Sequence, residues 1–165
     1  MPNYTPRRAT LADTDALVRH RVRMFEDMGV LDASGPGSEP MAAAFRTWLA
    51  DEMPSGAYVA WVVECAPLAG DVRPDIVAGG GATIIPWPPG PRYGGTRLAF
   101  VYNVYTEPDH RGRGLARLVM DQIHAFCREA GIGSVALNAS TFGQPLYESM
   151  GYRVTTSPMM FLSLD

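Results

Sequence analysis

The stretch that most constrains the fold of this chain runs from residue 98 to residue 128. Residues 98–106 are rich in β-branched and aromatic side chains, which is typical of a buried strand. Residues 107–114 have the composition of a turn, with glycine at positions 112 and 114. Apolar side chains then recur at three- and four-residue spacing, which predicts a helix that ends near Gly131; they are Leu115, Val119, Ile123 and Phe126. The chain therefore passes from a strand through a glycine-rich turn into a helix.

This turn predicts a phosphate-binding site. Glycine at positions 112 and 114 permits positive φ angles and lets the backbone approach an anion closely. Successive N–H groups meet at the start of the helix, where the helix dipole favours negative charge. Arg111 and Arg113 add donors suited to a phosphate. An ordinary surface turn would need the same glycines, but the position between a strand and a helix favours an anion site. The spacing matches neither the dinucleotide nor the nucleoside-triphosphate motif.

Composition and charge exclude several classes of protein. The 165 residues, 47% hydrophobic and 19% charged, are typical of one globular domain that spans residues 1–165. A net charge of −3 argues against a nucleic-acid partner. Cys65 and Cys127 stand far apart without a cysteine or histidine cluster, so we expect no metal site. No segment resembles a signal peptide or a membrane span, so we expect a cytoplasmic protein without a membrane partner.

The rest of the chain alternates between strand and helix patterns. Pro54 is expected to end the second helix, because proline cannot continue it. The expected elements are a strand at Tyr4–Ala9, helices from Thr10 to Gly29 and from Glu39 to Met53, strands at Tyr58–Glu64, Ile76–Ile85 and Ser134–Asn138, a short helix at Gln144–Met150, and two final strands at Val154–Thr156 and Met159–Leu164.

Two details of these segments carry further expectations. Three consecutive glycines, residues 79–81, predict a bend, a bulge or close backbone packing within their strand. His20 and Arg21 lie near the apolar face of the first helix, and we interpret them as a satisfied structural polar pair.

The element order and two motifs resemble the GNAT superfamily of acyl-CoA-dependent N-acyltransferases. The family turn R/Q-x-x-G-x-G/A is matched by Arg111, Gly114 and Ala116, and a Leu-Tyr-Glu-x-x-Gly-Tyr segment follows at residues 146–152. The resemblance covers nearly the whole chain. It implies an α/β fold in which a mixed, mostly antiparallel central sheet has helices on both faces and a splay between its fourth and fifth strands.

The resemblance also implies that the chain binds acetyl-CoA. Backbone amides of the turn would hold the pyrophosphate, and main-chain groups of the fourth strand would pair with the pantetheine arm. The implied cofactor-binding residues are Val104, Tyr105, Thr106, Arg111, Gly112, Arg113, Gly114, Leu115, Ala116, Arg117 and Ser140. Many relatives carry asparagine where this chain has Ser140, so the hydrogen bond to the pantetheine arm is weaker here or comes from Asn138.

Tyr147 aligns with the family tyrosine that acts as general acid for the departing thiolate. A phenol of pKa about 10 protonating a thiolate of pKa about 8.5 is uphill by roughly 2 kcal/mol. No carboxylate lies within residues 98–106 to serve as the base. The amine proton therefore leaves through ordered water, or through a carboxylate from the first helix and its loop, for which the candidates are Glu26, Asp27 and Asp32. We interpret His110 as a turn residue.

The resemblance implies transfer of an acetyl group to a primary amine by direct attack in a ternary complex. The acceptor would be a small molecule or a peptide, held between the first two helices and residues 86–95, with Trp87, Arg92 and Tyr93 as candidate wall residues. The alternative is a non-catalytic acyl-CoA-binding sensor or partner-binding module. A homodimer, with residues 159–164 contributing an edge, is a further expectation by analogy with relatives.

Overall fold

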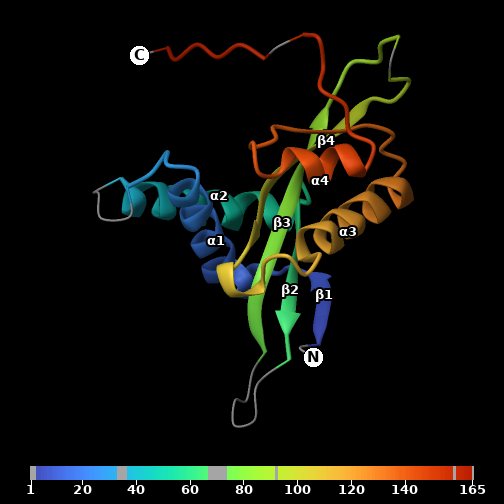
Figure 1. Ribbon diagram of the computed structural model, residues 1–165. Coiled ribbons are helices and arrows are strands. Elements are labelled where there is room, and N and C mark those ends of the chain that lie inside the picture. Colours follow the sequence, from blue (N-terminus) through green and yellow to red (C-terminus); the bar gives the residue numbers. More distant parts are fainter. Residues whose placement is uncertain (1–2, 33–36, 67–73, 92, 158, 165) are drawn as a thin grey trace.

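The computed structural model describes residues 3–32, 37–66, 74–91, 93–157 and 159–164. Its helices and strands follow the predicted order through the short helix α4 (Figure 1). The elements are β1 (Tyr4–Arg8), α1 (Thr14–Asp27), α2 (Ser38–Ser55), β2 (Tyr58–Cys65), β3 (Asp75–Pro86), β4 (Arg97–Thr106), α3 (Leu115–Glu129), β5 (Val135–Leu137) and α4 (Gln144–Ser149), with 3-10 turns at Leu11–Asp13 and Pro108–His110.

The five strands form one sheet in the order β1-β2-β3-β4-β5. The first four strands pair antiparallel: α1 and α2 lie between β1 and β2, and shorter connections join β2 to β3 and β3 to β4. β5 follows the crossover through α3 and pairs parallel with β4. The predicted mixed, mostly antiparallel sheet is confirmed.

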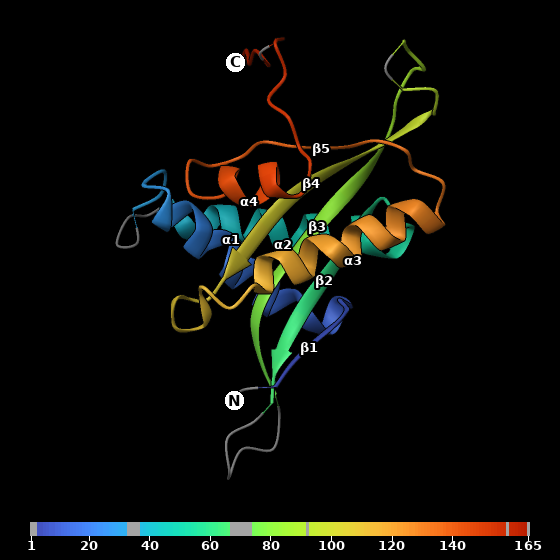
Figure 2. The same cartoon turned by 45° about the vertical axis from the view of Figure 1, so that its right-hand side comes forward.

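Helices cover both faces of this sheet, as predicted (Figure 2). On one face, the apolar stripe of α3, with Leu115, Val119 and Ile123, packs in a buried cluster with Trp61 and Val101. On the other face, Leu17 of α1 and Phe45 and Leu49 of α2 pack in a second cluster with Tyr58 and Val62. Alternate residues of β2 therefore serve opposite faces, which is the period of a strand buried on both sides.

β4 carries a bulge opposite the glycine triplet of β3. Gly79 pairs with Tyr105 and Gly81 with Tyr102, so β4 has one more residue than β3 between these pairs. Asn103, within the bulge, has φ +58°. A Cβ at Gly81 would lie 2.4 Å from the Tyr58 hydroxyl, and one at Gly80 would lie 3.0 Å from the Val104 side chain. The expectation of a bulge and close packing is confirmed.

β4 and β5 diverge beyond a short pairing. β5 pairs only through Ala99–Val135, Phe100–Ala136 and Val101–Leu137. Residues 102–106 of β4 therefore have no strand beside them on this edge within the described part of the chain. The predicted splay between the fourth and fifth strands is thereby confirmed.

The end of α2 differs from the prediction. Pro54 lies inside the helix, which continues to Ser55. Pro54 removes one backbone bond, to the Ala50 carbonyl, and the helix continues only one residue beyond it. The helix ends at Gly56, which adopts the left-handed conformation with φ +76°.

The two final strands that we predicted at residues 154–156 and 159–164 are not formed. Beyond Gly151 the described residues have no strand pairing, and the segment runs away from the sheet (Figure 1). Apolar residues alone do not make a strand, because a strand needs an edge to pair with, and β5 is only three residues long. Met160, Phe161 and Leu162 are each at least 80% exposed as a result.

Candidate active site

The glycine-rich turn places a run of free backbone donors at the start of α3. Gly112 and Gly114 adopt φ angles of +72° and +78°, which favour glycine. The Arg111 N–H bonds to the Pro108 carbonyl at 3.2 Å, and the next backbone bond is from the Leu118 N–H to the Gly114 carbonyl at 3.0 Å. Between them, the N–H groups of residues 112–117 have no acceptor in the described part of the chain. Such an array at a helix N-terminus can bind an anion.

The three arginines of the turn lie differently. Arg111 faces α1, where it forms an ion pair with Asp27 and donates to the Thr106 carbonyl at 2.9 Å. Arg113 is exposed and bonds only weakly to the Asp109 carbonyl, at 3.4 Å. Arg117 bonds to the Ser149 hydroxyl of α4. The turn therefore offers an anion its backbone N–H groups and the exposed Arg113, whereas the guanidinium of Arg111 ties the turn to α1.

The cofactor residues predicted in β4 lie in its unpaired half, beside the splay. Val104 faces α3 and packs with the cluster that holds Leu115 and Val119. Tyr105 faces α1, where its ring lies 5.3 Å from that of His20. The Thr106 carbonyl already accepts a hydrogen bond from Arg111. The main-chain groups of this edge that remain free to bind a ligand therefore lie before Thr106 in the strand.

Tyr147 lies on α4, on the same face of the sheet as Val104. It is half-buried, and its ring meets that of Tyr152 edge-on at 5.8 Å. A Cβ at Gly143 would lie 2.9 Å from the Tyr147 ring, so the lack of a side chain at this position leaves room for the ring. The hydroxyl makes no hydrogen bond to any described residue, and burial raises its pKa above the ordinary value for tyrosine. A half-buried phenol whose hydroxyl has no partner among the described residues can donate a proton to a bound ligand.

Ser140 has a structural role in this arrangement. Its hydroxyl accepts from the Gly143 N–H at 3.1 Å, and its carbonyl accepts from the Gln144 N–H at 2.9 Å. It therefore shapes the turn that leads into α4. Asn138, the alternative donor to the pantetheine arm, is exposed.

The three candidate bases differ in their surroundings. Asp27 is held by Arg111, and Asp32 is exposed. Glu26 is half-buried and has no partner within the described residues. It lines a pocket of about 690 Å³ together with Tyr105, Glu107 and His110. His110 itself bonds to the Tyr4 hydroxyl at 2.9 Å, in agreement with its interpretation as a turn residue.

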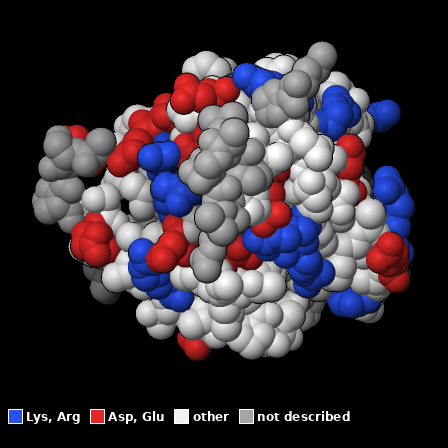
Figure 3. All heavy atoms as spheres, turned by 90° about the horizontal axis from the view of Figure 1, so that it is seen from below, with Lys and Arg blue, Asp and Glu red and all other residues white. Residues whose placement is uncertain are grey.

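A charged cluster that the sequence did not reveal lies beside this pocket. His20 is 1% exposed, and its Nε2 lies 3.4 Å from Oε1 of Glu107 without a hydrogen bond. Burial lowers the pKa of His20 to about 4, against the opposing attraction of Glu107. Burial opposes ionisation of Glu107, yet hydrogen bonds from Arg19 and Arg23 hold its pKa below its usual range. Seen from below, basic and acidic groups adjoin one another on this surface (Figure 3).

Arg21 departs most from its interpretation as a satisfied residue. Its guanidinium lies over the rings of Phe25, at 4.9 Å, and Phe45, at 4.7 Å. It donates to the side-chain oxygen of Asn103 in the β4 bulge. Its only described partner is thus a neutral amide. An arginine one turn before a phenylalanine was the sequence signal for the Phe25 contact, but the second ring, Phe45, comes from another helix.

Trp87 and Tyr93, the described residues of the predicted acceptor wall, lie far from the β4 bulge. Trp87 and Tyr93, each 40% exposed, belong to the turn beyond the Pro86–Arg97 pair. Six residues of strand separate Gly80, at the bulge, from Pro86, which corresponds to about 20 Å. These two side chains therefore do not adjoin the bulge, and Arg92 lies outside the described residues.

The described residues lack two further features. None of the helices there combines the length and apolar character of a membrane span. No group of three or more histidine, cysteine, aspartate or glutamate side chains is arranged to hold a metal ion in that part of the chain.

Comparisons with known proteins agree with this architecture. A family model for the acetyltransferase (GNAT) domain matches residues 96–162. Comparison with curated protein sequences gives no significant match. A predicted acetyltransferase from Clostridium acetobutylicum, solved with acetyl-CoA, is similar at 25% identity, with a TM-score of 0.78 over 100% of this chain and 96% of that one. Glucosamine-6-phosphate N-acetyltransferase from Arabidopsis thaliana, at 17% identity and a TM-score of 0.66 over 99% of each chain, shares the fold.

A structure from Ralstonia eutropha JMP134 shows to which family this chain belongs. This GCN5-related N-acetyltransferase is 32% identical, with a TM-score of 0.81, and the match covers 97% of this chain and 99% of that one. Identity at this level over nearly the whole of both chains shows common ancestry as well as a common fold. The chain therefore belongs to the GCN5-related N-acetyltransferase (GNAT) family.

Proposed function

We propose that this protein transfers an acetyl group from acetyl-CoA to a primary amine of a small-molecule or peptide acceptor. One observation carries the proposal: the unpartnered N–H groups of residues 112–117 lie at the end of a strand whose last five residues, 102–106, have an open edge. A diphosphate joined to an extended arm fits this combination of anion site and strand edge. The Clostridium acetobutylicum relative, solved with acetyl-CoA, supports acetyl-CoA as the donor.

In this proposal the chain aligns the donor through its backbone. The N–H groups of residues 112–117 bind the diphosphate, and the edge of β4 up to Tyr105 pairs with the pantetheine arm. An N–H group of the bulge stabilises the negative charge that develops on the thioester oxygen. The amine nitrogen forms a bond to the acyl carbon, the carbon–sulfur bond breaks, and Tyr147 protonates the departing thiolate.

The raised pKa of Tyr147 affects this last step. Burial keeps the phenol protonated, but it also widens the pKa difference between phenol and thiolate. The thiolate would be released beside the same apolar cluster, where burial raises its own pKa as well. The two effects partly cancel, so a roughly 2 kcal/mol difference remains a fair measure of the uphill step.

The amine must lose a proton for the reaction to proceed. Glu26 is the candidate base that the geometry favours: Glu26 and Asp27 both line the pocket beside Tyr105, but Asp27 is held by Arg111. A proton can pass from the amine to this carboxylate through water in the pocket.

The proposal is tested by two measurements on the full chain. Calorimetry measures binding of acetyl-CoA, and release of free thiol measures transfer to a panel of amino acids, amino sugars, polyamines and peptides. Transfer to any of these amines supports the enzyme. Tight binding of acetyl-CoA without thiol release for any amine would favour the alternative, a non-catalytic acyl-CoA-binding module.

The exposed C-terminal segment supports a homodimer as part of the proposal. Residues 159–164 present a run of exposed apolar side chains, and a monomer rarely exposes so continuous a patch. β5 offers an edge strand that a second copy could pair with. Light scattering after size-exclusion chromatography should give twice the chain mass, and a chain ending at Thr156 should give the single mass. A full-length monomer at high concentration would contradict the dimer.

A further inference from the structure

Unlike several other arginines of this molecule, Arg21 has no carboxylate partner among the described residues. Five arginines form described ion pairs with carboxylates; they are Arg7, Arg19, Arg23, Arg46 and Arg111. Arg21 is half-buried, and no carboxylate of the described residues lies against it. Taking a charge out of water without an opposite charge is costly, so such a site favours an anion from outside the chain.

The surroundings of Arg21 leave most of its donors unused. A guanidinium carries about five N–H groups, and the described bond to Asn103 uses one of them. The rings of Phe25 and Phe45 lie against the guanidinium, whose remaining donors lie in its plane. Burial lowers the pKa of Arg21, and the nearby phenols of Tyr58 and Tyr102 only partly oppose this. The Tyr58 hydroxyl is buried near the Asn103 side chain.

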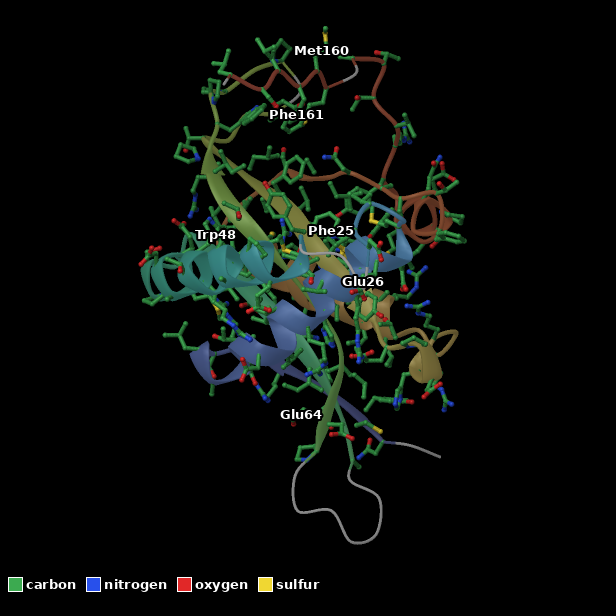
Figure 4. All side chains as sticks on the ribbon, turned by 90° about the vertical axis from the view of Figure 1, so that its left-hand side faces the viewer. Phe25, Glu26, Trp48, Glu64, Met160 and Phe161 are labelled. Atoms are coloured by element: carbon green, nitrogen blue, oxygen red, sulfur yellow. The ribbon has the colours of Figure 1, made fainter. Side chains whose placement is uncertain are left out.

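Arg21 lies close to the proposed position of the acyl group. Its partner Asn103 lies in the β4 bulge, next to Val104. α3 and Tyr147 occupy the face of the sheet on which Val104 packs. An acceptor therefore reaches β4 from the other face, which α1 and α2 cover and on which Phe25 and Trp48 lie (Figure 4).

We propose that Arg21 binds a carboxylate of the acceptor, so that the substrates of this enzyme are amines that carry a carboxylate group close to the amine. This inference rests on the proposed function. A planar guanidinium fork matches the two oxygens of a carboxylate. A phosphate monoester with a charge near −2 would remain undercompensated beside a single cation, so a carboxylate is the better match.

The first test uses the unmodified protein and matched substrates. Each amino acid of a panel is compared with its own carboxamide and with the corresponding amino phosphate, where the amine is unchanged and only the anion differs. We expect kcat/KM for the carboxylate to exceed that for the carboxamide by about 10- to 100-fold, as for a hydrogen-bonded charge pair. Equal values for the two would overturn the inference, and so would a preference for the phosphate.

The second test uses Arg21→Gln. This variant should lose the preference, with kcat/KM falling about 10- to 100-fold for the carboxylates and little for the carboxamides. Arg21→Lys should restore part of it, because it keeps the charge but not the fork. Arg46→Gln is the matched control, since Arg46 pairs with Asp15 on the exposed side of the helices. A fall of equal size on both substrate classes would show that Arg21 is only structural.

A binding measurement separates this inference from the proposed function. If no amine is acetylated although acetyl-CoA binds, calorimetry of the same amino acids and carboxamides still compares the two classes on wild-type protein and on Arg21→Gln. Carboxylate binding that Arg21→Gln abolishes would support the inference without catalysis. Failure of the wild-type protein to bind any amino acid more tightly than its carboxamide would overturn it.

Discussion

A valine at position 114 should remove most of the affinity for acetyl-CoA. Gly114 is the N-cap residue of α3, with φ +78°. No atom of the described structure lies within 4 Å of a Cβ built there, so the protein itself can accommodate a side chain. The valine would instead project into the space in front of the free N–H groups. The expected loss is therefore one of binding, beyond the cost of backbone strain.

The size of this loss follows from the donors that valine would block. A hydrogen bond to a charged group contributes about 1.5 to 3 kcal/mol. Separation of the diphosphate from two N–H groups then costs about 3 to 6 kcal/mol, which weakens binding by roughly 10²- to 10⁴-fold. The left-handed backbone conformation adds a cost of about 1 to 2 kcal/mol in stability for any L-residue.

Gly131 provides the matched control at the other end of α3. It has φ +69°, and a Cβ there also meets no atom within 4 Å. Gly131→Val should therefore lower the thermal midpoint about as much as Gly114→Val, but it should leave the affinity for acetyl-CoA unchanged in calorimetry. Equal affinities for the two variants would refute the assignment of the diphosphate site to this turn.

Three further predictions concern single side chains. Tyr147→Phe should lower kcat by about 10²-fold or more while the Kd for acetyl-CoA stays unchanged, and an unchanged kcat would remove Tyr147 as the acid. Glu26→Gln should lower kcat/KM for amines at neutral pH, whereas Glu39→Gln, on the exposed start of α2, should not. The pKa of His20 falls from 6.5 to about 4 on folding, so the unfolded chain binds the proton first as the pH drops. The free energy of unfolding should then decrease between these pH values by on the order of 3 kcal/mol, and urea titrations of His20→Gln should lack this part of the decrease.

The sequence predicted those features that depend on neighbouring residues. The glycines at 112 and 114 require a turn, and the apolar spacing after them requires a helix, so the free N–H groups of the turn followed from local pattern alone. The three glycines at residues 79–81 likewise predicted the bulge, because a side chain at Gly80 would collide with Val104 and one at Gly81 would collide with Tyr58. The predicted roles of the site residues in binding and catalysis stay predictions.

Contacts between residues far apart in the sequence could not be predicted from local patterns. Arg111 was expected to face a phosphate, but its direction depends on Asp27, which is 84 positions away. Arg21 was interpreted as satisfied, although its partner Asn103 is 82 positions away and neutral. The two final strands failed for a related reason, because the apolar pattern of residues 159–164 does not say whether a strand edge is within reach.

The proposed acetyl-CoA site and the proposed acceptor site depend on α1 to different extents. The N–H groups of residues 112–117 belong to the turn and to α3, so their anion-binding capacity does not depend on α1. α1 is linked to the turn by the Asp27–Arg111 ion pair, whose side chains are 46% and 47% exposed, and by the ion pairs of Arg19 and Arg23 with Glu107. Exposed pairs such as Asp27–Arg111 contribute about 0 to 1 kcal/mol. In contrast, Arg21 contacts Asn103 of β4, and Glu26, also on α1, lines the pocket. Substitutions in α1 should therefore change which amine is used and how fast, and leave acetyl-CoA binding nearly intact.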